Sequence, residues 1–413
     1  MKNKLSFVTL SLLSSIVFIP SVFAKDITLR YSIWDRNQLQ VEETLIKKFE
    51  EQNPGIKISL DLITPSKEYW VKLGAATAGG VAPDVFWINM PRFKQYANND
   101  LLEPLDNYID NSGFDTDAII KSSLNAYKHN DNQLSIPRDI DSIALWFNKK
   151  LFDEAGVSYP TNDWNWDDLR QTAEKLHQKL GDKAYPIVLE LNREGQDSYL
   201  NLLYQAGLNI VPANGQPTDI ASDKAIWVYE ELQDMMKDGS LPSIEQMSEI
   251  TPQDVFQSNR AAMVYAGSWF SGPFSKNELI KDHIGVVKMP KIEREATVSH
   301  SIGLAISANS ENKDAAWKFV SFMTSEASQA EISKVVIPAN KNVAGKWTES
   351  IDNIDVSAHV EALEFSLPYP VAGTNNPKWQ DLWKSALNKI FLGGDARKEM
   401  DNVINRIEKQ MSQ

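Results

Sequence analysis

Cysteine is absent from the 413 residues, and only five of them are histidine. Without cysteine the chain can form no disulfide bridge, and it lacks the thiol that bacterial lipoproteins acylate beside their cleavage site. No HxxxH or HExxH spacing occurs, and no adjacent tyrosine pair offers phenolates to ferric ion. The scattered histidines are His129, His177, His283, His300 and His359. We therefore expect neither a metal site nor a cofactor.

Motifs for phosphate binding and nucleophilic catalysis are missing as well. The sequence contains no P-loop, no GxGxxG and no GxSxG pattern. The formal net charge is −13, so nucleic acid is a poor partner on electrostatic grounds. Neither an enzyme nor a nucleic-acid-binding protein is indicated by these features.

The first residues follow the order of a secretory signal. Lys2 and Lys4 precede an apolar stretch from Leu5 to Ile19, and small residues follow up to Ala24. The apolar stretch is too short for a comfortable membrane span, and no later segment reaches the roughly 20 apolar residues that spanning needs. We expect residues 1–24 to be a signal peptide cleaved near Ala24, and the mature chain to be a soluble monomer in a Gram-negative periplasm. An uncleaved N-terminal anchor is the alternative.

The length of the chain exceeds what one hydrophobic core usually serves, so two lobes are expected. Alternation of apolar and polar side chains predicts strands over residues 27–33 and 56–62, with a helix over 41–49 between them and a short buried strand at Pro83–Trp87. Strands alternating with helices are typical of an α/β lobe with a mainly parallel sheet. No Gly/Ser/Pro linker is present, so ordered strands should join the lobes.

The same pattern returns after Ser142. A helix is predicted over Asp167–Leu180, and strands are predicted over Pro186–Leu191 and Ala261–Tyr265. Ser222 is in position to cap a further helix, and Thr251-Pro252 places a cap and an N1 proline where helices favour them. The second half of the chain is therefore also α/β.

Five segments occur in order along the chain: Gly80–Trp87 (GVAPDVFW), Leu101–Leu105 (LLEPL), Ile136–Lys149, Phe256–Trp269 (FQSNRAAMVYAGSW) and Ala315–Phe319. Together they resemble the extracellular solute-binding proteins of sugar ABC transporters, family 1, the maltose-binding-protein-like proteins. Asn259 stands where that family usually has glycine, and asparagine is the commonest other residue to accept a left-handed backbone.

The resemblance implies an α/β, two-lobe periplasmic-binding-protein fold with discontinuous lobes joined by hinge strands. The implied division is 25–138 and 289–337 for lobe one, and 139–288 and 338–413 for lobe two. The implied crossings are Arg138–Asp141, Val287–Pro290 and Ile337–Asn340. A proline-bearing strand falls at each of the three crossings.

The resemblance also implies a function. A solute-binding protein would capture a sugar or oligosaccharide between its lobes and deliver it to the membrane permease subunits of an ABC transporter, without catalysis. A secreted glycoside hydrolase is one alternative, although Asp139 and Asp141 share one face of a strand and cannot readily flank a glycosidic bond. A protein for an acidic or phosphorylated sugar is another, since Arg36, Arg138 and Arg193 could accept an anion.

Candidate binding residues lie where strands end, because ligands of open α/β sheets bind outside the carboxyl ends of strands. Trp34 and Asp35 close the first predicted strand, and Trp87 and Asn89 close the third. An aromatic ring can stack on a pyranose, while carboxylate and amide groups bind its hydroxyls. Trp34 and Trp87 could instead fill the core.

The crossing segment adds Asp139 and Asp141, of which Asp141 matches a ligand-binding carboxylate of the resembled family. An ordinary hinge salt bridge with Arg138 is the alternative reading. Arg193 and Glu194 belong to a polar cluster after a lobe-two strand, where that family contributes cleft contacts.

The resemblance supplies the remaining candidates. Gly267, Ser268 and Trp269 match a Gly-x-Trp turn whose tryptophan stacks on sugar. Gly373 and Trp379 lie where the last aromatic contact of the family is found, and Trp379 is favoured over Trp383. We expect the other tryptophans to be packing residues: Trp146, Trp164, Trp166, Trp227 and Trp317.

Overall fold

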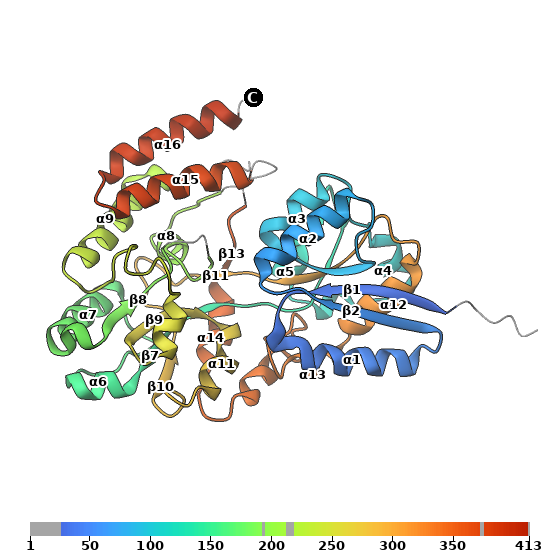
Figure 1. Ribbon diagram of the computed structural model, residues 1–413, viewed down its shortest axis with the longest axis horizontal. Helices are drawn as coiled ribbons and strands as arrows, with labels where there is room; N and C mark the ends of the chain where they lie inside the picture. Colours follow the sequence, from blue (N-terminus) through green and yellow to red (C-terminus); the bar gives the residue numbers. More distant parts are fainter. Residues whose placement is uncertain (1–25, 192–194, 212–218, 372–375, 412–413) are drawn as a thin grey trace, which may run out of the picture.

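The computed structural model describes residues 26–191, 195–211, 219–371 and 376–411, which form two α/β lobes side by side (Figure 1). Each lobe has its own sheet and its own hydrophobic core. The expected two-lobe α/β fold is therefore confirmed. Within these ranges, no helix combines the length and the apolar character needed to cross a bilayer.

Lobe one is built on a five-stranded sheet of order β2-β1-β3-β12-β6. Its strands are β1 (Ile27–Ile33), β2 (Ile56–Leu62), β3 (Val85–Asn89), β6 (Ile136–Pro137) and β12 (Ile302–Ile306), beside a small hairpin of β4 (Lys128–His129) and β5 (Asn132–Gln133). Strands β1, β2 and β3 run parallel, whereas β12 runs antiparallel to β3 and β6. The return strand β12 belongs to a part of the chain that is far away in sequence.

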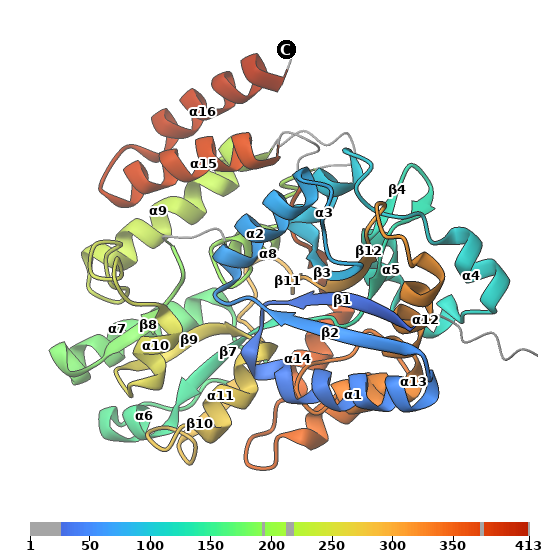
Figure 2. The same cartoon turned by 45° about the vertical axis from the view of Figure 1, so that its right-hand side comes forward.

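Helices cover both faces of this sheet, with α1 and α13 on one side and α2 and α3 on the other (Figure 2). The helices of lobe one are α1 (Leu39–Gln52), α2 (Ser66–Ala78), α3 (Met90–Ala97), α4 (Asp106–Ser112), α5 (Lys121–Ala126), α12 (Lys313–Met323) and α13 (Glu326–Ile332). The alternation that predicted the first strand is confirmed, since Leu29, Tyr31 and Ile33 are fully buried.

Lobe two has a four-stranded sheet of order β10-β7-β9-β8 and a two-stranded sheet of β11 and β13. The strands are β7 (Ile143–Asn148), β8 (Tyr185–Val188), β9 (Ala261–Gly267), β10 (Ile284–Val287), β11 (Thr297–Ser299) and β13 (Ser366–Pro368). In the four-stranded sheet the pairs β7/β9 and β10/β7 are antiparallel and the pair β8/β9 is parallel, and β11 and β13 also run parallel. The expectation of a mainly parallel sheet was wrong here, because periodicity reports burial and not strand direction.

The helices of lobe two surround its sheet and end in the hairpin of α15 and α16, which packs beside α9 (Figure 1). They are α6 (Lys149–Ala155), α7 (Trp166–Leu180), α8 (Leu200–Gln205), α9 (Asp223–Lys237), α10 (Pro252–Gln257), α11 (Ser271–Lys276), α14 (Ser357–Glu361), α15 (Asn376–Phe391) and α16 (Ala396–Met411). Short 3-10 turns are η1 (Arg36–Gln38), η2 (Thr116–Ala118), η3 (Gly181–Lys183), η4 (Asp219–Ala221), η5 (Ser268–Phe270), η6 (Ala344–Ser350) and η7 (Ala362–Phe365).

Local signals in the sequence correspond to local structure. The Ser222 side chain accepts a hydrogen bond from the Ala225 backbone N–H, and Thr251 caps α10 ahead of Pro252. Asn259 has a φ of 60°, which is the left-handed backbone expected where related proteins carry glycine. These three predictions are confirmed.

Three crossing segments lie side by side between the lobes. The Arg138 backbone N–H donates to the carbonyl of Ile302 at 2.8 Å, and that of Ile140 donates to the carbonyl of Ile337 at 2.9 Å. The Asp141 N–H donates to the carbonyl of His300 at 3.0 Å. The segment 138–141 is therefore the middle strand of the hinge.

The second crossing lies later in the chain than predicted. Val287–Pro290 was expected to enter lobe one, yet Met289, Ala296 and Val298 all pack in the core of lobe two. Strand β11 also pairs with β13 of that lobe, so the chain first reaches lobe one at His300–Ile302. The boundary at 289 is corrected to about 300, because the proline at 290 marks a loop of lobe two.

The fold predicts that Trp317 is a packing residue. Its side chain is 5% exposed and lies against the rings of Tyr108 and Phe114, with centroids at 5.8 and 5.5 Å. Trp317→Ala should lower the free energy of unfolding by about 3–5 kcal/mol, because it leaves a cavity in the core. Urea denaturation measures this change. Trp227→Ala, at a site 40% exposed, is the matched control and should cost much less; equal losses would contradict the assignment.

Candidate functional site

A cavity of about 530 Å³ lies between the lobes. Lobe one contributes Trp34, Asp35, Gln38, Ser66, Trp70, Asn89, Pro91, Arg92 and Val336. The hinge contributes Asp139, Ile140, Asp141, His300 and Ile302. Lobe two contributes Gly195, Gln196, Asp197, Ser268, Trp269, Tyr369, Gln380 and Asp381. The cavity thus collects side chains from segments that are remote in sequence, as a ligand site between two lobes requires.

The lobe-one wall carries an aromatic platform centred on Trp34, directly after β1. The Trp34 ring contacts Trp70 on α2, with centroids 5.2 Å apart, and meets Tyr69 edge-on at 4.9 Å. Trp34 and Trp70 are both half-buried and line the cavity. Two indole rings therefore offer exposed surface to a ligand at the carboxyl ends of β1 and β2.

Trp87 does not belong to this exposed surface, and its prediction as a binding residue was wrong. It is fully buried beneath Trp34, with ring centroids 5.1 Å apart. Its indole N–H donates to the hydroxyl of Tyr31 at 2.6 Å. Because β3 lies in the middle of the sheet and is covered on both faces, the Trp87 ring supports the platform from below.

Asp35 and Asn89 line the cavity and also start helical turns. The Asp35 carboxylate accepts hydrogen bonds from the Asn37 backbone N–H at 2.9 Å and from the Gln38 amide at 3.1 Å. The Asn89 side chain accepts one from the N–H of Arg92. Capping fixes the orientation of both side chains, so their remaining lone pairs face the cavity without a further loss of side-chain freedom.

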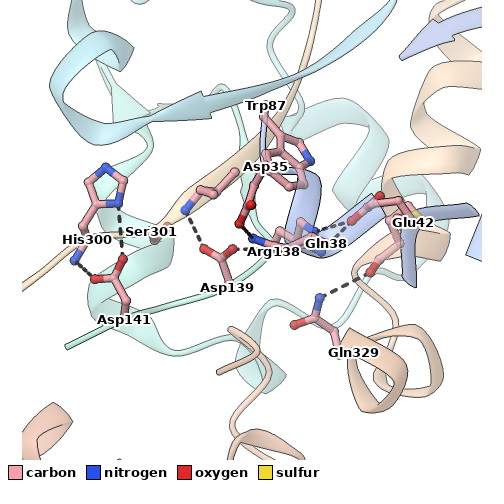
Figure 3. Close-up of polar contacts among 12 residues, drawn as sticks. Asp35, Gln38, Glu42, Trp87, Arg138, Asp139, Asp141, His300, Ser301 and Gln329 are labelled. Atoms are coloured by element: carbon pink, nitrogen blue, oxygen red, sulfur yellow. Dashed lines mark hydrogen bonds and ion pairs between the residues drawn. The ribbon is translucent and has the colours of Figure 1, made fainter. Parts of the chain in front are cut away.

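The hinge segment buries a charged group directly behind the cavity. The Arg138 guanidinium is fully buried, and its Nε donates to Glu42 of α1 at 2.9 Å (Figure 3). Another nitrogen of the group donates to Asp139 at 3.1 Å, and the group lies 4.8 Å from the Trp87 ring centroid. The salt bridge between Arg138 and Asp139, which was the alternative interpretation, is therefore present. Asp139 also lines the cavity.

Burial raises the pKa of Asp139 to about 6, although Arg138 and a backbone hydrogen bond oppose the shift. The other carboxylate oxygen of Asp139 accepts that bond, from the Ile302 N–H at 2.7 Å. A carboxyl group removed from water holds its proton more tightly, and two favourable contacts compensate only in part.

Asp141 joins the hinge to lobe two. One of its oxygens accepts the His300 backbone N–H at 2.8 Å (Figure 3). The same oxygen accepts a hydrogen bond from the Gln196 amide at 2.6 Å. The other oxygen lies 3.5 Å from Nδ1 of His300. The loop that follows β8 is held further by Gln253, whose amide donates to Asp197 at 2.6 Å. The carboxylate therefore fixes the position of a loop on the lobe-two wall.

The lobe-two wall has its own aromatic platform at Trp269, in the turn η5 after β9. A side chain at Gly267 would place its Cβ 2.0 Å from the Trp269 ring, so the indole lies flat against the glycine backbone. The Ser268 N–H donates to the carbonyl of Ser142 at 3.0 Å, which ties the turn to the hinge. Gly267, Ser268 and Trp269 thus act together, with Ser268 and Trp269 reaching the cavity.

Trp379 was predicted to face the cavity, and the structure corrects this. It is 1% exposed and stacks on Trp383 in the core of lobe two, with centroids 5.2 Å apart. The next two residues of α15, Gln380 and Asp381, line the cavity instead. The predictions for Arg193, Glu194 and Gly373 lie outside the described residues.

Fifteen of the 22 lining residues named above were not predicted, among them Trp70, Arg92, Gln196, Asp197, His300, Tyr369, Gln380 and Asp381. Trp70 lies inside α2, eight residues after the end of β2, so the strand-end argument that selected Trp34 does not extend to it. Asp197 comes three residues after Glu194, so the argument for the polar cluster after a strand could have found it. His300 could not be found, because its place depends on the shifted second crossing.

The model of the family described as bacterial extracellular solute-binding protein matches residues 37–330, which is more than half of the chain. Among curated proteins, the chain is 25% identical to a binding protein of Brucella abortus, over 85% of this chain and 84% of that one. It is 24% identical to the maltotriose-binding protein of Pyrococcus abyssi, over 70% of this chain and 60% of that one.

Solved structures show the same fold. An ABC substrate-binding protein from Listeria monocytogenes in complex with cycloalternan superposes with a TM-score of 0.85 and 26% identity, covering 94% of this chain and 100% of that one. UgpB from Mycobacterium tuberculosis in complex with glycerophosphocholine gives a TM-score of 0.82 at 18% identity, covering 93% and 98%. At 18% identity, the similarity to UgpB shows a shared fold and nothing more.

The site predicts a pH dependence of stability that Asp139 causes. Its pKa in the folded chain, about 6, lies above the value of about 3.9 for an unfolded aspartate, so protonation favours folding. That contribution is complete below about pH 4 and is lost as the pH rises through about 6. We compare the unfolding free energy of the wild type with that of Asp139→Asn. The wild-type value minus the variant value should fall by up to about 3 kcal/mol as the pH rises from about 4 to above about 6, since one pKa unit corresponds to 1.36 kcal/mol.

Urea denaturation at a series of pH values measures this difference. Asp401→Asn removes an exposed carboxylate of α16 and is the control, with a flat difference expected. A wild-type advantage over Asp139→Asn that stays constant or grows with pH would contradict the raised pKa.

Proposed function

Because the chain belongs to the family of bacterial extracellular solute-binding proteins, we propose that it captures a sugar or oligosaccharide between its lobes and delivers it to the permease subunits of an ABC transporter. Sugar binding by related proteins supports this proposal, namely the maltotriose-binding protein of Pyrococcus abyssi and the Listeria monocytogenes protein in complex with cycloalternan.

One observation carries the proposal: aromatic rings face the same cavity from both lobes. Trp34 and Trp70 lie on the lobe-one wall, and Trp269 lies on the lobe-two wall. The apolar faces of a pyranose ring can pack between such platforms, while carboxylates and amides between them bind the hydroxyl groups. A ligand held in this way contacts both lobes, so its binding energy favours the closed arrangement.

We propose further that the protein binds its sugar without cleaving it. Glycoside hydrolysis needs two carboxyl groups on opposite sides of the scissile bond. Asp139 and Asp141 come from a single short strand, and each is already engaged by protein donors. Arg138 and the Ile302 N–H hold Asp139 in place, so its carboxyl group is not free to approach a glycosidic oxygen.

The family is extracellular, and we propose the periplasm as the location, with cleavage near Ala24 and a monomeric mature protein. In cells of a Gram-negative host, osmotic shock should release a chain whose N-terminal sequence begins near Lys25. Size-exclusion chromatography with light scattering should give the mass of one chain. An intact chain in the membrane pellet, or a dimer mass, would contradict the corresponding part of the proposal.

The binding site is tested at Trp269. A thermal-shift screen over a carbohydrate panel should identify sugars that raise the melting temperature, since a ligand that binds only the folded state stabilises it. Trp269→Ala should weaken binding of those sugars by at least about tenfold, while the melting temperature without ligand changes little, because the ring is half-buried at the cavity.

Gly267→Ala should weaken binding as well, since its Cβ would displace the Trp269 ring. Trp227→Ala changes an exposed tryptophan outside the cavity and is the control, with unchanged affinity. Wild-type affinity in Trp269→Ala would show that the site is placed wrongly.

A further inference from the structure

We propose that the cavity selects neutral and basic glycans and rejects acidic ones, and that Asp381 is one of the residues that determine this specificity. The inference rests on the proposed function and adds the charge class of the ligand. It follows from the inventory of charges and hydrogen-bonding groups on the cavity walls.

Acidic groups outnumber basic ones on these walls. Among the described residues, the lining includes five carboxylates, which are Asp35, Asp139, Asp141, Asp197 and Asp381, and one guanidinium, that of Arg92. His300 also lines the cavity and lies against Asp141.

Of the three arginines that were expected to be able to accept an anion, Arg36 and Arg138 do not line the cavity, and Arg193 lies outside the described residues. The Arg138 guanidinium is fully buried and engaged by Glu42 and Asp139 behind the cavity. Arg36 is exposed and is not among the lining residues. Arg92 is exposed too, and its guanidinium lies 5.8 Å from the centroid of the Trp70 ring. Among the described lining residues, one guanidinium is therefore present beside five carboxylates.

The lining carboxylates keep acceptor capacity for a ligand. A carboxylate has about four lone-pair positions, and Asp35, for instance, uses one position on each oxygen for protein donors. Asp381 differs from the others, because it is exposed on α15 and has no hydrogen-bond or ion-pair partner among the described residues. No described protein group neutralises the Asp381 carboxylate, so its charge acts on solvent and on any ligand in the cavity.

These walls match a ligand that donates hydrogen bonds. Sugar hydroxyls and ammonium groups bring donors to carboxylate acceptors, and an ammonium group also brings the opposite charge. The carboxylate group of a uronate, or a phosphate group, brings acceptors and a negative charge. The lining carboxylates therefore repel it and form no hydrogen bonds with it. The structure thus favours the neutral reading of the ligand over the acidic or phosphorylated alternative that the sequence left open.

Matched sugars test the proposal. Disaccharides that raise the melting temperature are compared by calorimetry with derivatives that differ only at one C6 position, as hydroxyl, carboxylate or amine. At about 0.02 M salt the carboxylate form should bind at least about tenfold more weakly than the hydroxyl form, and the gap should narrow at about 0.3 M salt, where charges are screened. The amine form should bind at least as tightly as its parent.

Variants assign the effect to the cavity. Asp381→Asn should reduce the difference in affinity between the hydroxyl and carboxylate forms, and Asp381→Lys should reduce this gap further. Asp401→Asn is the control: it changes the net charge by the same amount as Asp381→Asn, at an exposed position of α16, and should leave the gap unchanged. An unchanged gap in Asp381→Lys overturns the role of Asp381.

The outcomes separate the two proposals. Hydroxyl and carboxylate forms that bind equally well overturn the charge selection and leave sugar binding intact. If no sugar of the carbohydrate panel raises the melting temperature, sugar binding itself is overturned, and the charge selection falls with it. If only uronates or sugar phosphates raise it, the charge selection alone is overturned.

Discussion

The buried Arg138 guanidinium is the interaction on which the rest of the structure depends. It joins α1 of lobe one, through Glu42, to the hinge carboxylate of Asp139, and it packs on the Trp87 ring under the aromatic platform. A buried ion pair is a weak source of net stability, but removal of one partner leaves an uncompensated charge in the core at a cost of about 3–5 kcal/mol. The network therefore specifies one arrangement of helix, hinge and platform.

The hinge segment 138–141 also lines the cavity, through Asp139, Ile140 and Asp141. Asp139 and Asp141 line it, while the backbone of 138–141 bonds to the other two crossing segments. In the proposed function, recognition of a ligand and the angle between the lobes therefore depend on the same residues. A hydroxyl that binds Asp141 acts on a carboxylate already bound to Gln196 of lobe two and to His300 of the hinge. This sharing gives ligand contact a direct route to lobe movement.

Sequence reasoning succeeded where one local pattern decides the structure. The period of two over 27–33, the caps at Ser222 and Thr251, and the left-handed Asn259 all depend on neighbours within a few residues. The boundary at 289 failed because a proline marks an irregular strand without telling which lobe the next residues join. That choice depends on long-range packing of Met289 and Val298 in the core of lobe two.

The two tryptophan errors have separate physical causes. Trp87 lies in a strand covered on both faces, where the side chains of residues 85–88 are all buried and alternation gives no direction. Trp379 and Trp383 are four residues apart on α15, so they lie on the same face of the helix and stack on each other. A prediction that places one in the cavity and the other in the core contradicts this geometry. The residues that follow Trp379, at 380 and 381, turn to the cavity for the same geometric reason.

The two aromatic platforms combine recognition with stability to different degrees. Trp34 is braced by Tyr69, Trp70 and Trp87, so its ring is part of the lobe-one core as well as part of the cavity. Trp269 lies on the backbone of Gly267, and its one ring neighbour is Phe270 at 5.9 Å among the described residues. Loss of the Trp34 ring must therefore disturb folding and binding together, whereas loss of the Trp269 ring acts mainly on binding. Because lobe one carries the braced platform and the buried Arg138, it offers the more firmly supported surface for the lobe closure that the proposed function requires.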